Sequence, residues 1–192
     1  NAGEFDDENY IANPYNRCFY CKNKLYQTIG KHTTSVIFSG ANVSDLSDFR
    51  PGLLAAERYG VRHPYIEAGI DKEKIREIAK MMNLTDLAEL PAQPCLSSRI
   101  KTGLRIEEQL LPLINQAENN LSMLFEGLDV RCRIELNSIR VEICRTAFER
   151  LCKDEKNKIH KIVQEVFAET RAIAVTEVSI APYVKGSAFV KP

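Results

Sequence analysis

Apolar and polar positions divide the first half of the chain into short segments that alternate between strand and helix character. Residues 35–39 form an apolar, β-branched run that ends at Gly40 and predicts a buried strand, and residues 63–67 predict another. Residues 51–59 predict a short helix. Asp71 is placed to cap a further helix with one apolar stripe, which consists of Ile75, Ile78, Ala79 and Met82. This alternation predicts part of a parallel-sheet α/β domain.

A different pattern begins near residue 104. A long helix is predicted up to Gly127, and its apolar face consists of Ile106, Leu110, Ile114, Ala117, Leu121 and Leu124. Two alternating runs, 130–135 and 139–144, follow this helix and are separated by an Asn-Ser pair. They predict a β-hairpin whose polar face is rich in arginine.

The end of the chain completes a second domain. Residues 146–149 have the form of a capping box, which predicts a helix reaching about residue 169. Residues 172–180 alternate as a closing strand. We therefore expect an α/β domain over residues 1–104 and a small α+β domain over residues 105–192.

Composition narrows the classes of partner. The 192 residues contain 26 basic and 26 acidic side chains, so no global field attracts nucleic acid or a membrane surface. No stretch approaches the ~20 apolar residues that a membrane span needs. Apolar residues make up 44% of the chain, which is ordinary for a globular protein with its own core. Six cysteines in such a chain favour metal or redox chemistry in a reducing compartment, and hence a cytoplasmic protein.

Three of these cysteines stand in chemically suggestive surroundings. Cys18 and Cys21 form a C-x-x-C pair flanked by Arg17 and Lys22, and Cys95 lies in a loop rich in proline and serine. Neighbouring positive charge lowers the pKa of a thiol and favours the thiolate that binds metals. The pair also fits two plainer roles, inert packing in a core or half of a structural zinc site.

Three cysteines without an evident fourth also suit a [4Fe–4S] cluster that keeps one iron open to an external ligand. Cys95 has an alternative role as a nucleophile. Ser97, Ser98 and Arg99 follow it and are suited to bind an anionic group, with the arginine acting as a bidentate clamp.

The polar face of the hairpin carries Arg131, Arg133 and Arg140. Such a face is usually solvated. If it points into a cleft, its arginines can bind phosphate or carboxylate groups, with Glu118 and Glu142 balancing their charge. The remaining cysteines and the histidines are interpreted as structural or incidental: Cys132, Cys144, Cys152, His32, His63 and His160.

Several separated motifs now carry a family resemblance. The longer ones are Asn13-Pro14-x-x-Arg17-Cys18-x-x-Cys21-Lys22, Gly40-Ala41-Asn42-x-x-Asp45-x-x-Asp48-x-Arg50-Pro51-Gly52 and Pro94-Cys95-Leu96-Ser97-Ser98-Arg99-Ile100. The shorter ones are Gln116-Ala117-Glu118, Arg140-Val141-Glu142-Ile143 and Gly186-Ser187. In this order they resemble the ATP-dependent sacrificial sulfur transferases of the LarE type.

The resemblance implies a Rossmann-like ATP pyrophosphatase domain of the PP-loop type, here truncated, followed by the small α+β domain. It implies an enzyme that uses ATP and Mg²⁺ to adenylate a carboxylate of a pyridinium dicarboxylate mononucleotide. Sulfur then replaces the activated oxygen, giving a thiocarboxylate for the nickel-pincer cofactor of lactate racemase. Adenylation supplies the leaving group that a carboxylate lacks.

The family has two sulfur sources. In one branch the cysteine matching Cys95 gives up its own sulfur. In the other, cysteines matching Cys18, Cys21 and Cys95 hold a [4Fe–4S] cluster that carries a transferable sulfide, and this chain resembles that branch. The resemblance assigns cofactor and substrate binding to Asn42, Asp45, Arg50, Ser98, Arg99, Glu118, Arg131, Arg133 and Glu142. It also implies a homo-oligomer.

The family's Ser-Gly-Gly-x-Asp-Ser phosphate loop has no match in residues 1–192. We therefore expect this chain alone to hydrolyse ATP poorly, and a separate polypeptide is a candidate source of the loop. Two other readings stay open. One is a related ATP pyrophosphatase that thiolates tRNA, although the neutral charge counts against it. The other is a non-catalytic metal-binding or oligomerisation scaffold.

Overall fold

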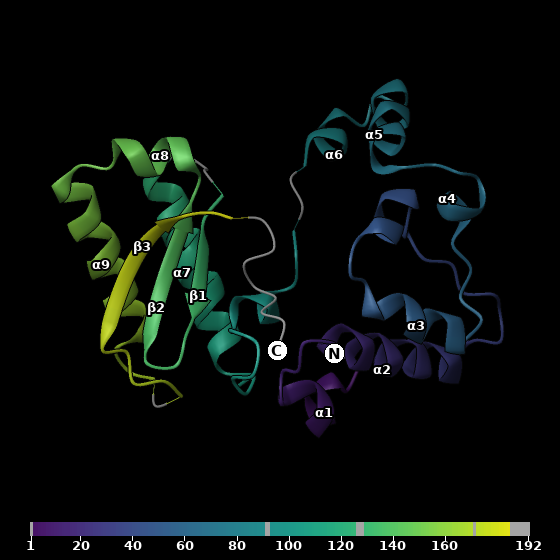
Figure 1. Ribbon diagram of the computed structural model, residues 1–192, viewed down its shortest axis with the longest axis horizontal. Helices are drawn as coiled ribbons and strands as arrows, with labels where there is room; N and C mark the ends of the chain where they lie inside the picture. The colour runs from purple at the N-terminus through teal and green to yellow at the C-terminus, as the bar shows by residue number, and fades with distance from the viewer. Residues whose placement is uncertain (1, 91–92, 126–128, 171, 185–192) are drawn as a thin grey trace. The chain divides into compact units, whose positions relative to one another are not determined.

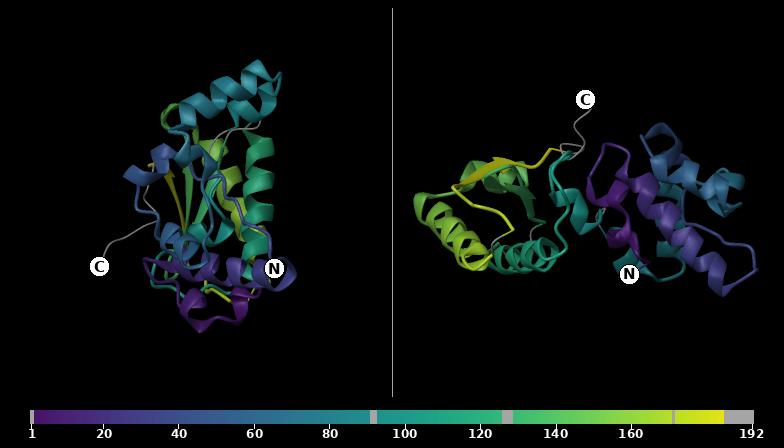
Figure 2. Two further views of the ribbon diagram at one scale, coloured as in Figure 1. Left: turned by 90° about the vertical axis from the view of Figure 1, so that its right-hand side faces the viewer. Right: turned by 90° about the horizontal axis from the view of Figure 1, so that it is seen from below.

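The structure is a computed structural model that describes residues 2–90, 93–125, 129–170 and 172–184 (Figures 1 and 2). The chain divides into two compact units. The first comprises Asn1–Tyr10 with Asn16–Gln93, and the second comprises Ile11–Tyr15 with Pro94–Pro192. The division thus falls before the boundary expected near residue 105. Gly127, Gly186 and Ser187, which figure in the sequence analysis, lie outside the described residues.

The first unit is mainly helical. Its elements are η1 (Glu4–Asp6), α1 (Glu8–Ile11, whose last residue falls in the second unit), α2 (Arg17–His32), η2 (Val43–Ser47), α3 (Pro51–Arg58), α4 (Pro64–Glu67), α5 (Lys72–Met81) and α6 (Thr85–Glu89). Helices α2 and α3 pack against each other (Figure 1). Between them lies a small core of Tyr26, Ala55, Ala56 and Val61.

Two helix predictions for this unit are confirmed. Helix α3 begins at Pro51, whose fixed φ suits the first helical position. Helix α5 begins after Asp71, whose carboxylate accepts a hydrogen bond from the Lys74 N–H at 2.8 Å. Both starts are local signals, so the sequence alone could place them.

The two strand predictions are wrong in different ways. Residues 35–39 do not form a strand, and their β-pairing among the described residues is a single parallel bridge between Phe38 and Arg62. Residues 63–67 are not a strand, because Pro64 opens the short helix α4 instead. Among the described residues of this unit, the expected parallel sheet is therefore reduced to the single bridge between Phe38 and Arg62.

The second unit is a three-stranded sheet with helices packed on it. Its elements are η3 (Leu96–Arg99), α7 (Leu110–Leu124), β1 (Arg131–Ile134), β2 (Ser138–Ile143), α8 (Arg145–Arg150), α9 (Lys153–Phe167) and β3 (Glu177–Pro182). The strand order is β1-β2-β3. Helices α7 and α9 contact each other, and each also contacts the sheet (Figures 1 and 2). Their apolar faces and the strands form the core, which includes Ile114, Leu121, Ile139, Val141, Ile143, Ile159 and Val163.

The predicted hairpin is confirmed: β1 and β2 pair antiparallel, with Arg131 opposite Glu142 and Arg133 opposite Arg140. Strand β3 pairs with β2 in parallel, which requires the long crossover that α8 and α9 supply. The fold as a whole is mixed α/β, mostly helical, with one small mixed sheet.

The remaining helix limits differ from the prediction. The helix expected from residue 104 begins only at Leu110. The single helix expected over 146–169 is broken into α8 and α9, because a capping box starts a new helix at Cys152. There the Glu155 carboxylate accepts a hydrogen bond from the Cys152 N–H at 2.8 Å. Cysteine is not a usual N-cap residue, so this box gave no sequence signal.

No helix in the described ranges combines the length and the apolar character needed to cross a bilayer.

Candidate functional site

The C-x-x-C pair lies in the first two turns of α2. Cys18 and Cys21 are three residues apart on this helix, so they share one face, and both are half-buried. The N–H groups at a helix N-terminus favour negative charge, which stabilises thiolates there. The Arg17 side chain, which precedes the pair, is buried.

A glycine brings the neighbouring motif against this turn. A Cβ atom at Gly52 would lie 3.0 Å from the Lys22 Cγ and 3.6 Å from the Cys18 carbonyl oxygen. Gly52 therefore lets α3 approach the C-x-x-C turn closely. The Arg-Pro-Gly and C-x-x-C motifs, far apart in the sequence, are in contact.

The predicted binding residues of the first unit lie together in one turn. The Asn42 side chain accepts a hydrogen bond from the Ser44 N–H at 3.1 Å, and the Asp45 carboxylate accepts one from the Asn42 N–H at 3.1 Å. The Arg50 guanidinium lies 2.8 Å from the other oxygen of Asp45. The turn is thus rigid at Asn42, while the half-exposed Arg50 side chain faces solvent.

The structure adds a polar pair that the sequence analysis did not find. The Ser39 hydroxyl lies 2.6 Å from Nδ1 of His63, which had been considered incidental. Each residue follows one of the two segments joined by the Phe38–Arg62 bridge. In α/β proteins, ligands bind at the carboxyl ends of parallel strands. The sequence could not bring Ser39 and His63 together, because their pairing depends on a bridge that periodicity does not reveal.

In the second unit, Cys95 is exposed and stands immediately before the η3 turn. The Ser98 N–H donates to the Cys95 carbonyl oxygen at 2.9 Å, which closes the turn. Ser97, Ser98 and Arg99 are all buried. The thiol is therefore accessible on a turn whose following residues are fixed.

Arg99 anchors the turn to α7. Its Nε and Nη2 donate to the two carboxylate oxygens of Glu118 at 2.8 and 2.9 Å, and its Nη1 donates to the Pro94 carbonyl oxygen at 2.9 Å. Glu118 also accepts a hydrogen bond from the Cys132 N–H at 2.8 Å. This bidentate pair joins the Cys95 turn, α7 and β1.

Arg133 anchors the same turn to the sheet. Its Nη1 donates to the Ser98 carbonyl oxygen at 2.8 Å, and its Nε donates to Glu142 at 2.8 Å. Arg140 lies 3.3 Å from the other oxygen of Glu142 and 2.7 Å from Glu135. The network of Arg99, Glu118, Arg133, Glu142 and Arg140 is called the arginine–carboxylate network below.

A solvated arginine face is the wrong interpretation for β1. Arg131 and Arg133 are each only 6% exposed. The Arg131 guanidinium pairs with Asp129, through a contact of 2.6 Å from Nη2 to Oδ2. The alternating pattern showed that these residues share a face, but it could not show that other segments cover that face.

Cys132 and Cys144, which lie outside the proposed ligand set, differ in the pKa of their thiols. Burial raises the pKa of the Cys132 thiol, and the nearby charge of Glu118 raises it further, so this thiol stays protonated. Hydrogen bonds from the Thr146 hydroxyl and the Ala147 N–H lower the pKa of Cys144. Cys132 therefore has the structural role predicted for it.

Asn13 fastens the chain that follows the Cys95 turn. Its buried side-chain amide donates to the carbonyl oxygens of Ile100, Lys101 and Leu104 at 3.2, 2.9 and 2.9 Å. Its φ of 53° is in the left-handed region, which asparagine tolerates better than most residues. The Asn-Pro motif thus belongs structurally to the Cys95 turn.

The candidate metal ligands are divided between the units, with Cys18 and Cys21 in the first and Cys95 in the second. All three are thiols rather than disulfides. Inside either unit, the described residues contain no cluster of three His, Cys, Asp or Glu side chains suited to a metal ion.

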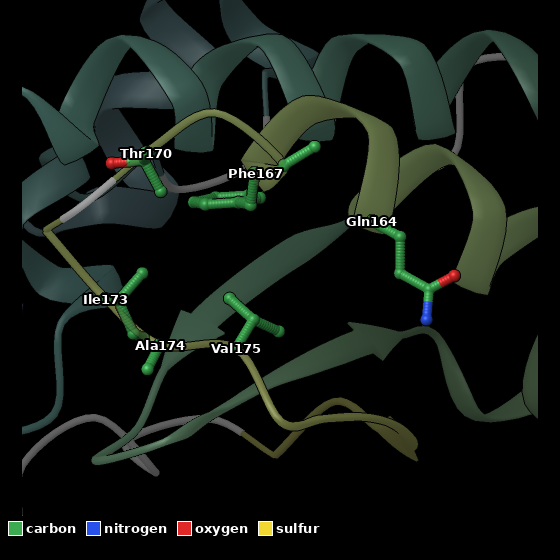
Figure 3. Close-up of a pocket in the computed structure, with 7 residues that line it drawn as sticks. Gln164, Phe167, Thr170, Ile173, Ala174 and Val175 are labelled. Carbon is green, nitrogen blue, oxygen red and sulfur yellow. The ribbon is translucent and has the colours of Figure 1, made fainter.

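A pocket of about 280 Å³ lies elsewhere in the second unit, between the end of α9 and the segment before β3 (Figure 3). Phe167 and the segment 173–175 line it, and the amide of Gln164 lies at its margin (Figure 3). Its lining residues are all distinct from the arginine–carboxylate network and from the cysteines. The pocket therefore adds no group to the candidate site.

Comparison with known proteins places this chain beside two relatives. It is 36% identical over 157 residues to "Uncharacterized protein slr1717" of Synechocystis, a match covering 80% of this chain and 58% of the relative. It is 28% identical over 174 residues to "Uncharacterized protein MJ0830" of Methanocaldococcus jannaschii, covering 88% of this chain and 64% of that protein. The chain thus spans about three fifths of the relatives it matches. No protein-family profile matches the chain.

Proposed function

We propose that this chain is part of an ATP-dependent sulfur transferase that converts an adenylated carboxylate to a thiocarboxylate. The observation that carries the proposal is the anchoring of the Cys95 turn. An exposed thiol follows Pro94, and two buried arginines hold the backbone on either side of it: Arg99 donates to the Pro94 carbonyl oxygen and Arg133 to that of Ser98. A sulfur-transfer site needs this combination of an accessible sulfur ligand and a fixed backbone.

The chemistry of the donor set fits a [4Fe–4S] cluster. Cys18 and Cys21 share one face of a helix at its N-terminus, where thiolates are stabilised, and Cys95 is accessible. In the proposal these three thiolates would hold the cluster. When bound, the cluster would supply a nucleophilic sulfide at neutral pH.

The buried arginines have a positioning role in this proposal. Arg99 and Arg133 are already paired with Glu118 and Glu142, and both donate to backbone carbonyl groups of the 94–99 segment. Their charges are thus matched inside the fold. Arg140 and Arg50, whose side chains are partly exposed, are better placed to contact a phosphate or carboxylate of the substrate.

Anaerobic reconstitution of the chain with iron and sulfide tests the proposal. We expect about four iron atoms and four sulfides per chain, with broad visible absorbance. Binding of zinc without sulfide would instead favour the metal-binding scaffold. Pyrophosphate release from ATP is a property of the complete enzyme, and we expect it to require the phosphate loop of the family.

A further inference from the structure

The first unit contains two of the six cysteines, Cys18 and Cys21. Both are thiols and both are half-buried in the first two turns of α2. The other four cysteines belong to the second unit: Cys95, Cys132, Cys144 and Cys152. Within the first unit, each thiol of the pair therefore has a single possible disulfide partner.

Helix geometry brings the two thiols within reach of each other. Residues three apart on a helix lie about 5 Å from Cα to Cα, since each residue rises about 1.5 Å and about 3.6 residues make a turn. Disulfides usually join Cα atoms about 4.4–6.8 Å apart. The Cβ atoms lie about 5–6 Å apart on a regular helix, whereas a disulfide brings them to about 3.8 Å. A bridge between Cys18 and Cys21 thus needs a local tightening of the helix.

The position of the pair at the start of α2 allows this tightening. Cys18 lies in the first turn, whose backbone N–H groups have no partner inside the helix, so this turn yields more easily than the helix interior. A disulfide that is closed under strain is more easily reduced than a relaxed one. The geometry therefore favours a reversible disulfide over a permanent structural one.

The charges around the pair favour an anionic oxidant. Lys22 directly follows Cys21 and is exposed, and α2 contains no aspartate or glutamate. Positive charge attracts anionic molecules and stabilises the thiolate that attacks a disulfide. A small anionic disulfide, such as oxidised glutathione, has the matching chemistry.

We propose that Cys18 and Cys21 exchange with small anionic disulfides and close to a reversible disulfide of their own. One cysteine thiolate attacks a sulfur of oxidised glutathione, forms a mixed disulfide and releases one glutathione thiolate. The second cysteine thiolate attacks the mixed disulfide and releases the other glutathione. Two protein thiols are thereby oxidised, one glutathione disulfide is reduced to two glutathione molecules, and the released thiolates take up the protons that the cysteines lose.

The disulfide itself does not depend on the proposed cluster, but its consequence rests on the proposed function. A closed disulfide removes two of the three proposed cluster ligands, because a metal binds the thiolate and not the disulfide. The oxidised chain should therefore take up no iron and sulfide until it is reduced. Cluster loading would then follow the thiol–disulfide balance around the protein.

A glutathione titration of the full chain tests the proposal. The folded chain, kept free of iron, is equilibrated with mixtures of reduced and oxidised glutathione, quenched with acid, alkylated and digested with trypsin. Cleavage after Arg17 and Lys22 places both cysteines on the peptide 18–22. We expect this peptide to escape alkylation and to lose about 2 Da as oxidised glutathione increases, and to recover both thiols in reduced glutathione.

A variant with altered spacing separates helix geometry from the mere presence of two thiols. Tyr20→Cys combined with Cys21→Ser keeps two thiols but places them two residues apart, where they do not face each other. It should form the internal disulfide at least about tenfold less at the same glutathione ratio. Cys21→Ser alone should instead retain one glutathione on Cys18 as a mixed disulfide.

The proposal is overturned if the pair stays as thiols or carries two glutathiones while the chain is folded. It is also overturned if the Tyr20→Cys, Cys21→Ser chain closes its disulfide equally well. Iron uptake then distinguishes it from the proposed function. If the disulfide forms but the reduced chain binds no iron and sulfide, the exchange stands and the cluster fails. If the reduced chain loads a cluster but the pair resists oxidation, the exchange alone fails.

Discussion

The Arg133 guanidinium donates a 2.8 Å hydrogen bond to the carbonyl oxygen of Ser98, so a buried charge on the sheet holds the turn that presents Cys95. The same side chain pairs with Glu142 at 2.8 Å. One arginine therefore fixes the backbone of the Cys95 turn while its own charge is neutralised inside the fold.

The first prediction concerns this pair. Arg133→Met should destabilise the chain by about 3–5 kcal/mol, because it leaves Glu142 buried without its nearest cation. Arg133→Met combined with Glu142→Leu should recover much of that loss. Urea unfolding of both variants, with exposed Arg145→Met as the matched control, measures the difference. Equal losses in the single and double variants would contradict the pairing.

The second prediction concerns Cys132 and alkaline pH. Burial raises the pKa of this thiol in the folded state, whereas the unfolded thiol titrates near its usual value of about 8.5. Above that pH the folded state binds more protons than the unfolded state. The contribution of this thiol to the free energy of unfolding is therefore fully present below about pH 8.5 and falls as the pH rises above it. The slope contributed by one such thiol is about 1.4 kcal/mol per pH unit.

Cys132→Ala should remove this slope from a plot of unfolding free energy between about pH 8.5 and 10, although it lowers stability at neutral pH. Cys152→Ala, at an exposed position, should leave the slope as it is. The same difference should appear in native alkylation, where Cys152 reacts and Cys132 does not. Alkylation of Cys132 in the folded chain would contradict the buried position of its thiol.

The third prediction concerns the contact at Gly52. Gly52→Val should destabilise the first unit by about 1–3 kcal/mol, because its side chain meets Lys22 and the Cys18 carbonyl group. Gly30→Ala is the matched glycine control in α2, where a Cβ atom meets nothing within 4 Å. It should stabilise the helix by about 0.5–1 kcal/mol. Thermal unfolding separates these opposite signs.

Local signals explain the parts of the fold that the sequence predicted. Asp71 as a cap, Pro51 at a helix start and the two alternating runs of the hairpin all act over a few residues. The pairing of the 35–39 segment depends on partners that are distant in sequence, because parallel strands are joined by long crossovers. Its single bridge to Arg62 could not be foreseen from periodicity.

The candidate site shows the same division. Arg99, Glu118, Arg133 and Glu142 were named in advance, first as groups suited to bind an anion or to balance its charge and then through the resemblance. Their partners could not be predicted, because Glu118 comes from α7, Arg133 from β1 and Arg99 from the turn after Cys95. Burial of two arginines on one strand depends on tertiary contacts, which an alternating pattern does not encode.

The iron content of a cysteine series, measured after anaerobic reconstitution, tests the central claim most directly. Cys18→Ala, Cys21→Ala and Cys95→Ala should each lose most of the bound iron and sulfide, because each removes one of three proposed cluster ligands. Cys152→Ala, an exposed thiol outside the proposed set, should retain the iron of the unmodified chain. Equal iron in Cys95→Ala and Cys152→Ala would contradict the account.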